Sequence, residues 1–224
     1  MTSLLNTTTT VKTLTPLPPH IKKTDVLSLL HNNERMLTLN PLLKSYQQLP
    51  PPSSIAFYSQ VPNALKPSST AEIEALPVFS VIESSSASSD QAEPEGADTW
   101  RGGWAKRIIP DEITYETSMQ AKDDGVVTIT HAPMGVHSVT TWVVRQEEAR
   151  DGLVLESRGD CTSNRVLMAF IRTTLQDSYD KLAKDFVEAL GKLVNGEGTG
   201  GENDREKAVA KETPTGNAEI DTVS

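Results

Sequence analysis

The chain has 224 residues, long enough for one domain with a substantial core, but only 37% of them are hydrophobic, so part of it is expected to stay unpacked. Its net charge of -9 lies in two polar segments: residues 83–98 contribute -5 and residues 195–224 contribute -4. The rest of the chain is neutral overall, which argues against a nucleic-acid binder and against a binder of anionic membranes.

The first third of the chain predicts a strand, two short helices and further strands. Residues 1–6 are expected to form a flexible N-terminus, and the threonine-rich, alternating segment 7–17 predicts a strand. A helix capped by Thr24 is expected to end before Asn32, and a second helix spans 34–39. Further strands are predicted over 42–49, 55–61 and 77–83.

The hydrophobic pattern of the second half changes once, from a period of two to a period of 3.6. The serine-rich, acidic segment 84–98 has almost nothing to bury and predicts a disordered insertion. Alternating segments with short turns between 113 and 159 predict an antiparallel meander. Residues 165–194 then predict one amphipathic helix, capped by Thr162 or Ser163, and 195–224 predict a disordered acidic tail.

This order of elements predicts an α+β fold. A sheet with one apolar face has to bury that face, and only the last helix is long enough to cover it. We therefore expect a curved antiparallel sheet wrapped around a long C-terminal helix, with two short helices after the first strand. Aromatic residues make up only 5% of the chain, which favours an unfilled apolar cavity between sheet and helix.

Four stretches carry a resemblance to a known superfamily: NPLL (40–43), WRGGW (100–104), DDGVVTITHAPMGV (123–136) and the helix 165–190. Together with the element order, they resemble the START-like superfamily of helix-grip domains, also called SRPBCC, and within it a fungal branch of uncharacterised domains. The similarity covers residues 7–194 apart from the insertion. It implies a bound hydrophobic ligand and brings with it neither catalytic residues nor a cofactor.

The predicted cavity takes its lining from the meander and from the long helix. The sheet-side residues are expected to be Tyr115, Met119, Val127, Ile129, His131, Met134 and Trp142. The helix-side residues are expected to be Leu167, Phe170, Ile171, Thr174 and Leu175. An ordinary closed core is the alternative for both sets, because amphipathic patterning looks the same in the two cases, and for Trp142 core packing is the favoured alternative.

Two histidines flank the Pro133–Gly135 turn. His131 and His137 supply at most two ligands, whereas zinc needs three or four, so no metal site is predicted. His131 continues the face of Val127 and Ile129 and is expected to orient the polar end of a ligand at the cavity rim. A surface or rim position without a function is the plainer alternative.

The favoured function is non-enzymatic binding, and with it transfer, of a lipid or other hydrophobic small molecule. One alternative is a polyketide cyclase or dehydratase-like enzyme, which needs an acid–base pair such as His131 with Tyr115 or Asp111. Another is a protein-interaction module with a filled interior. A single cysteine, no signal-peptide pattern and no apolar run of membrane length predict a cytoplasmic protein without stable membrane insertion.

Overall fold

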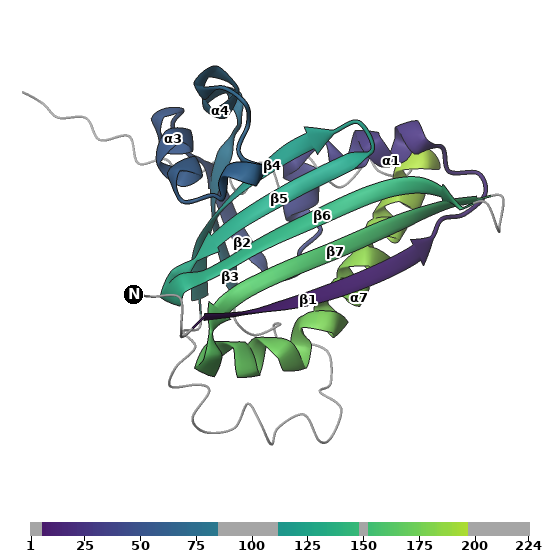
Figure 1. Ribbon diagram of the computed structural model, residues 1–224. Coiled ribbons are helices and arrows are strands. Elements are labelled where there is room, and N and C mark those ends of the chain that lie inside the picture. Colours follow the sequence, from purple (N-terminus) through teal and green to yellow (C-terminus); the bar gives the residue numbers. More distant parts are fainter. Residues whose placement is uncertain (1–5, 85–111, 148–151, 197–224) are drawn as a thin grey trace, which may run out of the picture.

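The computed structural model describes residues 6–84, 112–147 and 152–196, and these form a single seven-stranded antiparallel sheet with helices on both faces (Figure 1). The strand order is β1-β7-β6-β5-β4-β3-β2. The strands are β1 (Asn6–Pro16), β2 (Leu43–Gln48), β3 (Val78–Ser84), β4 (Glu112–Lys122), β5 (Gly125–Ala132), β6 (Val136–Glu147) and β7 (Gly152–Asn164). The helices are α1 (Lys23–Leu30), α2 (Asn33–Thr38), α3 (Pro52–Ser59), α4 (Thr70–Ala75) and α7 (Arg165–Val194), with 3-10 turns η1 (Asn63–Leu65) and η2 (Pro133–Gly135).

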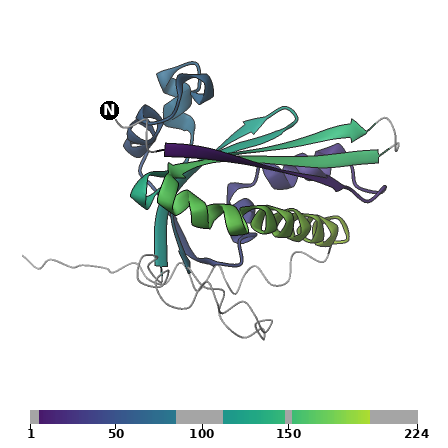
Figure 2. The same cartoon turned by 60° about the horizontal axis from the view of Figure 1, so that its bottom comes forward.

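The sheet curves around α7, as the sequence predicts for a helix-grip fold. Strands β4 to β7 follow one another as neighbours, and β1 returns to the far edge, where it pairs with β7 from Asn6↔Asn164 to Pro16↔Val154. Figure 2 shows α7 on one side of the sheet and the α3–α4 segment on the other. We call the side that α1, α2 and α7 cover the concave face, and the side beneath α3 the opposite face.

Each face of the sheet has its own hydrophobic core. On the concave face, Trp142 of β6 packs against Phe186 of α7 with ring centroids 5.4 Å apart, and Val126 and Leu30 belong to the same cluster. The smaller core beneath α3 contains Phe57, Tyr58, Val61, Val78 and Ile129. Both faces of the central strands are therefore covered over part of their length.

Helix α7 has the bounds that its periodicity predicts, but a different cap. Strand β7 continues through Ser163 to Asn164, and the Asn164 side chain accepts a hydrogen bond from the amide of Leu167 at 2.9 Å. Thr162 and Ser163 are therefore not the cap, because both still pair with β1. At the other end Gly196 adopts a φ of 74°, a conformation in which a helix commonly terminates.

One predicted strand is wrong, because residues 55–61 lie mostly in helix α3. Proline at the start of α3 has a φ that suits the first helical turn. The apolar residues Phe57, Tyr58 and Val61 follow helical spacing and are buried, whereas Ile55 is 46% exposed. The spacing that decides between the two periods spans only seven residues here, which is too short for the alternating pattern to be distinguished from the helical one.

Several predictions concern residues that the structure does not describe. The acidic insertion at 84–98, the tail at 195–224 and the N-terminal segment 1–6 lie almost entirely outside the described residues. Among the helices that are described, none has the length and apolar character that crossing a membrane requires.

Candidate functional site

The N-terminal half of α7 hydrogen-bonds to the edge strand of the sheet. Arg172 donates to Thr9 Oγ1 at 2.5 Å, and Gln176 donates to Thr13 Oγ1 at 3.2 Å, so the flank that carries them lies against the edge strand β1. At 100° per residue, Ile171 lies about 100° around the helix from Arg172, and Leu175 lies about 100° from Gln176, so both are on the flank adjacent to the one that contacts β1. Both are only half-buried.

The two halves of α7 differ in how completely they are packed. In the C-terminal half Ala183, Phe186 and Leu190 are buried against the sheet and α1. In the N-terminal half Met168 is the one described side chain that is fully buried. The predicted ligand contacts in this half that remain half-buried are Leu167, Ile171, Thr174 and Leu175. The side chain of Phe170, also predicted as a contact, is outside the described part of the structure.

Opposite this half of α7, the concave face carries small side chains in two rows, which we call the polar rows. The register aligns Met119, Thr128, Thr140 and Gly159 in one row. It aligns Thr117, Thr130, Ser138 and Cys161 in the next. Because paired residues point to the same face, the other seven share the concave face with the core residue Met119.

The polar rows are incompletely covered. Thr128 and Thr130 of β5 and Ser138 and Thr140 of β6 are half-buried, although they lie on central strands and on the face that α7 spans. In the adjacent row, toward α1, Val126 and Trp142 are 1% and 2% exposed. The concave face is therefore filled at the α1 end and partly accessible over the β5 and β6 members of the polar rows, whereas the β4 and β7 members are buried.

Tyr179 marks the boundary between the filled and the accessible part. Its hydroxyl lies 2.6 Å from Thr140 Oγ1, and its ring lies over the backbone of Gly159. Burial raises the pKa of Tyr179, so this hydroxyl remains protonated and available for the hydrogen bond. A side chain at position 159 would occupy the same space as the tyrosine, so glycine is what allows α7 to approach β7 here.

A half-buried carboxyl group lies on the concave face of β3, where Glu83 pairs with Ile113 of β4, four residues along the strand from Thr117 of the polar rows. Glu83 Oε1 accepts hydrogen bonds from the Tyr115 hydroxyl and from Asn40 Nδ2. Asn40 Oδ1 in turn accepts from the amide of Leu42 at 3.0 Å, which orients the Asn40 amide so that its NH₂ faces Glu83. Burial raises the pKa of Glu83, and burial together with the Glu83 charge raises the pKa of Tyr115.

The sheet residues that were predicted to line the cavity do not all lie on one face of the sheet. Tyr115 and Met119 lie on the concave face, and Trp142 lies there too but within the filled core. Val127 and Ile129 pack against the small core beneath α3, on the opposite face, and His131 contacts Phe57 there. The expectation that these three residues face the same space as Tyr115 is wrong. The β4–β5 hairpin pairs Met119 with Thr128, so it is the alternate residues of β5 that share the face of Met119.

The histidine pair sits at the end of the β5–β6 hairpin. His131 Nδ1 and His137 Nδ1 are 2.7 Å apart, and the His131 ring lies 4.5 Å from that of Phe57. Burial and the neighbouring His137 lower the pKa of His131. Met134, between them, has a φ of 58° and is 52% exposed at the hairpin tip, so it lines no interior space.

These histidines form neither the His131–Tyr115 acid–base pair nor a metal site among the described residues. His131 and Tyr115 lie on opposite faces of the sheet, so they form no acid–base pair. Asp111, the other predicted partner, lies outside the described residues, as do Trp100 and Trp104. Within the described ranges, no three His, Cys, Asp or Glu side chains converge as metal ligands.

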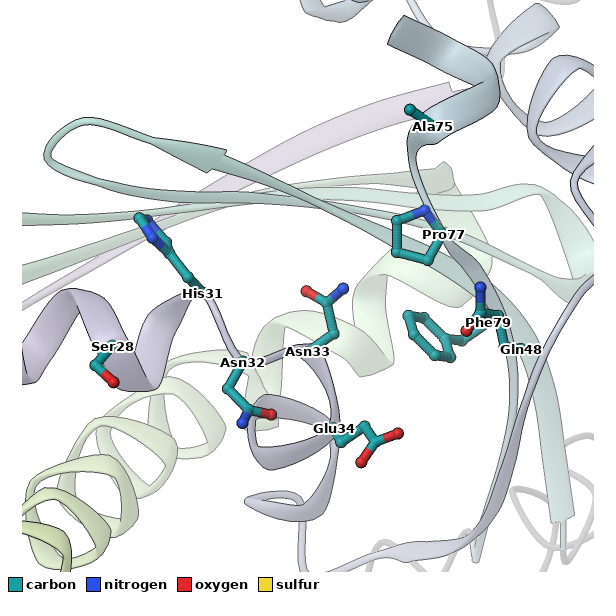
Figure 3. A pocket seen from close by; sticks show the side chains of 9 residues that line it. All are labelled: Ser28, His31, Asn32, Asn33, Glu34, Gln48, Ala75, Pro77 and Phe79. Atoms are coloured by element: carbon teal, nitrogen blue, oxygen red, sulfur yellow. The ribbon is translucent and has the colours of Figure 1, made fainter.

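Two open grooves lie elsewhere on the surface. One, of about 800 Å³, separates the α1–α2 junction from β2 and β3, and Figure 3 shows His31 and Asn33 on its helical side and Phe79 on its strand side. The other, of about 510 Å³, lies on the opposite face over β6 and β7 and is bordered by Val139, Thr141 and Arg158. None of the residues predicted to contact a ligand borders either groove.

A family model described as "Domain of unknown function (DUF7053)" matches residues 6–192. The chain belongs to this family. A search of curated proteins found no match. Sequence comparison therefore places this DUF7053 member in a family without assigning it an activity.

The fold itself has relatives of known structure. The di-domain ARO/CYC StfQ from the steffimycin biosynthetic pathway aligns with a TM-score of 0.50 and 12% identity over 84% of this chain and 52% of that one, so this chain spans about half of its length. A truncated norcoclaurine synthase from Thalictrum flavum aligns with a TM-score of 0.46 and 9% identity over 87% and 98% of the two chains. The sheet and long C-terminal helix of this DUF7053 chain, together with the likeness to StfQ, show a helix-grip fold and nothing beyond the fold.

Proposed function

We propose that this DUF7053 domain binds a hydrophobic small molecule, such as a lipid, between the polar rows and the N-terminal half of α7, without converting it chemically. The observation that carries the proposal is the half-burial of Thr128, Thr130, Ser138 and Thr140 on central strands, on the same sheet face as α7. A tightly packed sheet–helix interface would bury these positions as completely as it buries Trp142.

The helix supplies the apolar surface that such a ligand would cover. Ile171 and Leu175 remain half-buried on the flank of α7 next to the one that contacts β1. Removing apolar surface from water stabilises a complex by roughly 25 cal/mol per Å², so burying this flank favours binding. The threonine and serine hydroxyls of the polar rows would hydrogen-bond the polar atoms of the same ligand.

Each of the two rival functions requires a feature of its own. The cyclase-like alternative requires His131 to act with Tyr115 or Asp111; the sheet separates His131 from Tyr115, and Asp111 lies outside the described residues. The interaction-module alternative requires a contiguous exposed apolar patch. Among the described residues, the five exposed large hydrophobics are spread over four elements, β1, α3, η2 and the two ends of α7: Leu14, Ile55, Met134, Val166 and Val194.

The proposal is tested with N-phenyl-1-naphthylamine, a neutral apolar probe whose fluorescence rises when it leaves water. Saturable binding to the full chain is expected, and Thr128→Phe, which fills the polar rows, should weaken it at least tenfold. Thr141→Phe introduces the same side chain on the opposite face of the neighbouring strand and should leave binding unchanged. Ile171→Glu is a second blocking variant, made on the helix.

Native mass spectrometry of the freshly purified chain, followed by organic extraction, provides a second readout. A stoichiometric apolar compound in the wild type that is lost in Thr128→Phe supports the proposal. If wild type does not bind the probe, or if both blocking variants bind it as wild type does, the proposal is wrong.

A further inference from the structure

Resting on the proposed function, the structure assigns a chemical class to the ligand: we infer that Glu83 anchors a neutral hydroxyl group, so that the site selects apolar alcohols or phenols over apolar carboxylates. Glu83 occupies the concave face next to Tyr115, whose ring belongs to the same apolar cluster as Phe79 and Val81. A polar group at the end of an apolar binding surface is the arrangement that orients a ligand.

One oxygen of the Glu83 carboxyl group accepts two hydrogen bonds from the protein, and the other accepts none from the described residues. Oε1 accepts from both the Tyr115 hydroxyl and Asn40 Nδ2, and both donors are neutral. Oε2 has no hydrogen-bond partner among the described residues, and it is not one of the fully buried orphan atoms, so it keeps some accessible surface. Oε2 is therefore the atom that a ligand can reach.

The occupation of Oε1 also determines where a proton would reside. Because Oε1 accepts two hydrogen bonds, a proton bound to Glu83 resides on Oε2. A ligand hydroxyl both donates and accepts, so it pairs with Oε2 in either protonation state. A ligand carboxylate accepts only, so it pairs with protonated Glu83 and is repelled by the ionised form.

Compensating positive charge is absent from this part of the described structure. Neither Lys nor Arg among the described residues forms a salt bridge with Glu83. Burial accounts for most of the raised Glu83 pKa, and no cation offsets it. An anionic ligand would therefore meet a carboxyl group and neutral hydroxyls, whereas an alcohol would meet partners for both its donor and its acceptor.

The test compares three ligands of equal chain length by displacement of N-phenyl-1-naphthylamine at pH 8: 1-decanol, decyl methyl ether and decanoate. Wild type is expected to bind decanol at least tenfold more tightly than decanoate, and several-fold more tightly than the ether, which lacks the O–H donor. In Glu83→Gln the alcohol-to-carboxylate preference should fall at least tenfold.

Glu116→Gln is the matched control, because Glu116 is an exposed carboxylate on the opposite face of β4, next to Tyr115. It should keep the wild-type preference. Equal binding of decanol and decanoate to wild type, or an unchanged preference in Glu83→Gln, overturns the assignment of Glu83 while leaving the binding site itself supported. Failure of wild type to bind the probe overturns both proposals together.

Discussion

Gly159 of β7 and Tyr179 of α7 lie so close that a β-carbon at position 159 would be 2.0 Å from the tyrosine hydroxyl oxygen. The contact holds the middle of the long helix against the sheet, at the boundary between the filled core and the polar rows. Tyr179 also bonds to Thr140 at 2.6 Å, so displacing its ring would break a partly buried hydrogen bond as well.

Gly159→Ala is therefore expected to destabilise the protein by about 1–3 kcal/mol, the usual cost of forcing a side chain into occupied space. The free energy of unfolding from urea titration measures the effect. In a Tyr179→Ala background the same substitution should cost much less, because its steric partner is gone. Equal costs in the two backgrounds would show that the contact does not constrain the helix.

Gly191→Ala should have the opposite sign. Gly191 lies inside α7, and a β-carbon there would meet no atom within 4 Å among the described residues. Replacing glycine by alanine in a helix interior stabilises it by about 0.5–1 kcal/mol. Thermal unfolding of the variant should show a raised midpoint, and a lowered midpoint would indicate a close neighbour at this turn of the helix.

The difference between the two halves of α7 predicts unequal costs for the same truncation. Leu190 is 0% exposed in the concave core, so Leu190→Ala should cost about 2–5 kcal/mol. Leu175 is half-buried beside the polar rows, so Leu175→Ala should cost no more than about 1 kcal/mol in the ligand-free protein. Similar losses in urea titrations of both variants would mean that the N-terminal half is packed as tightly as the rest.

The histidine pair predicts a loss of stability in mild acid. Burial and His137 lower the pKa of His131 below its ordinary value of 6.5, so the unfolded chain binds this proton more readily than the folded one. Stability is then fully present above pH 6.5 and falls as the pH decreases from 6.5 to the lowered folded value. Protonation also places a charge beside the Phe57 ring and the His137 ring.

Unfolding free energies measured between pH 8 and pH 5 test this dependence. His131→Gln should flatten the curve in that range, since the titrating group is removed. His20→Gln changes an exposed histidine in the loop after β1 and should leave the curve as in wild type. A wild-type curve that does not fall below pH 6.5 would contradict the prediction.

The architecture was predictable because two signals agree. The switch from period two to period 3.6 near residue 165 defines α7, and short turns between alternating segments define the meander. A sheet of this kind has few options other than wrapping the one long helix. The helix-grip fold follows from these features without any catalytic motif.

The face of β5 was not predictable in the same way. Val127 and Ile129 look like the buried side of the strand, and they are buried, but beneath α3 rather than beneath α7. Because α3 was predicted as a strand, nothing was expected to cover the opposite face of the sheet. The misplacement of His131 among the ligand contacts follows from that single error.

Glu83 was missed for a related reason. At the sequence level it opens the run of acidic residues 83–98 and is counted with that surface charge. Its signal is the alternation of Phe79, Val81 and Glu83 on one side of β3, which places an acid where apolar residues are expected. Asn40 could not be found this way, because a loop brings it to Glu83.

The pairing of β1 with β7 places the first and last strands side by side, from Asn6↔Asn164 to Pro16↔Val154. A ribosome releases the N-terminal strand long before its partner has been synthesised. The sheet therefore cannot close at this edge until residue 164 has left the exit tunnel, and closure requires a contact between distant parts of the chain, which is slow. During translation β1 stays unpaired until β7 has been synthesised. Nascent chains stalled before residue 152 should therefore leave β1 accessible to proteases.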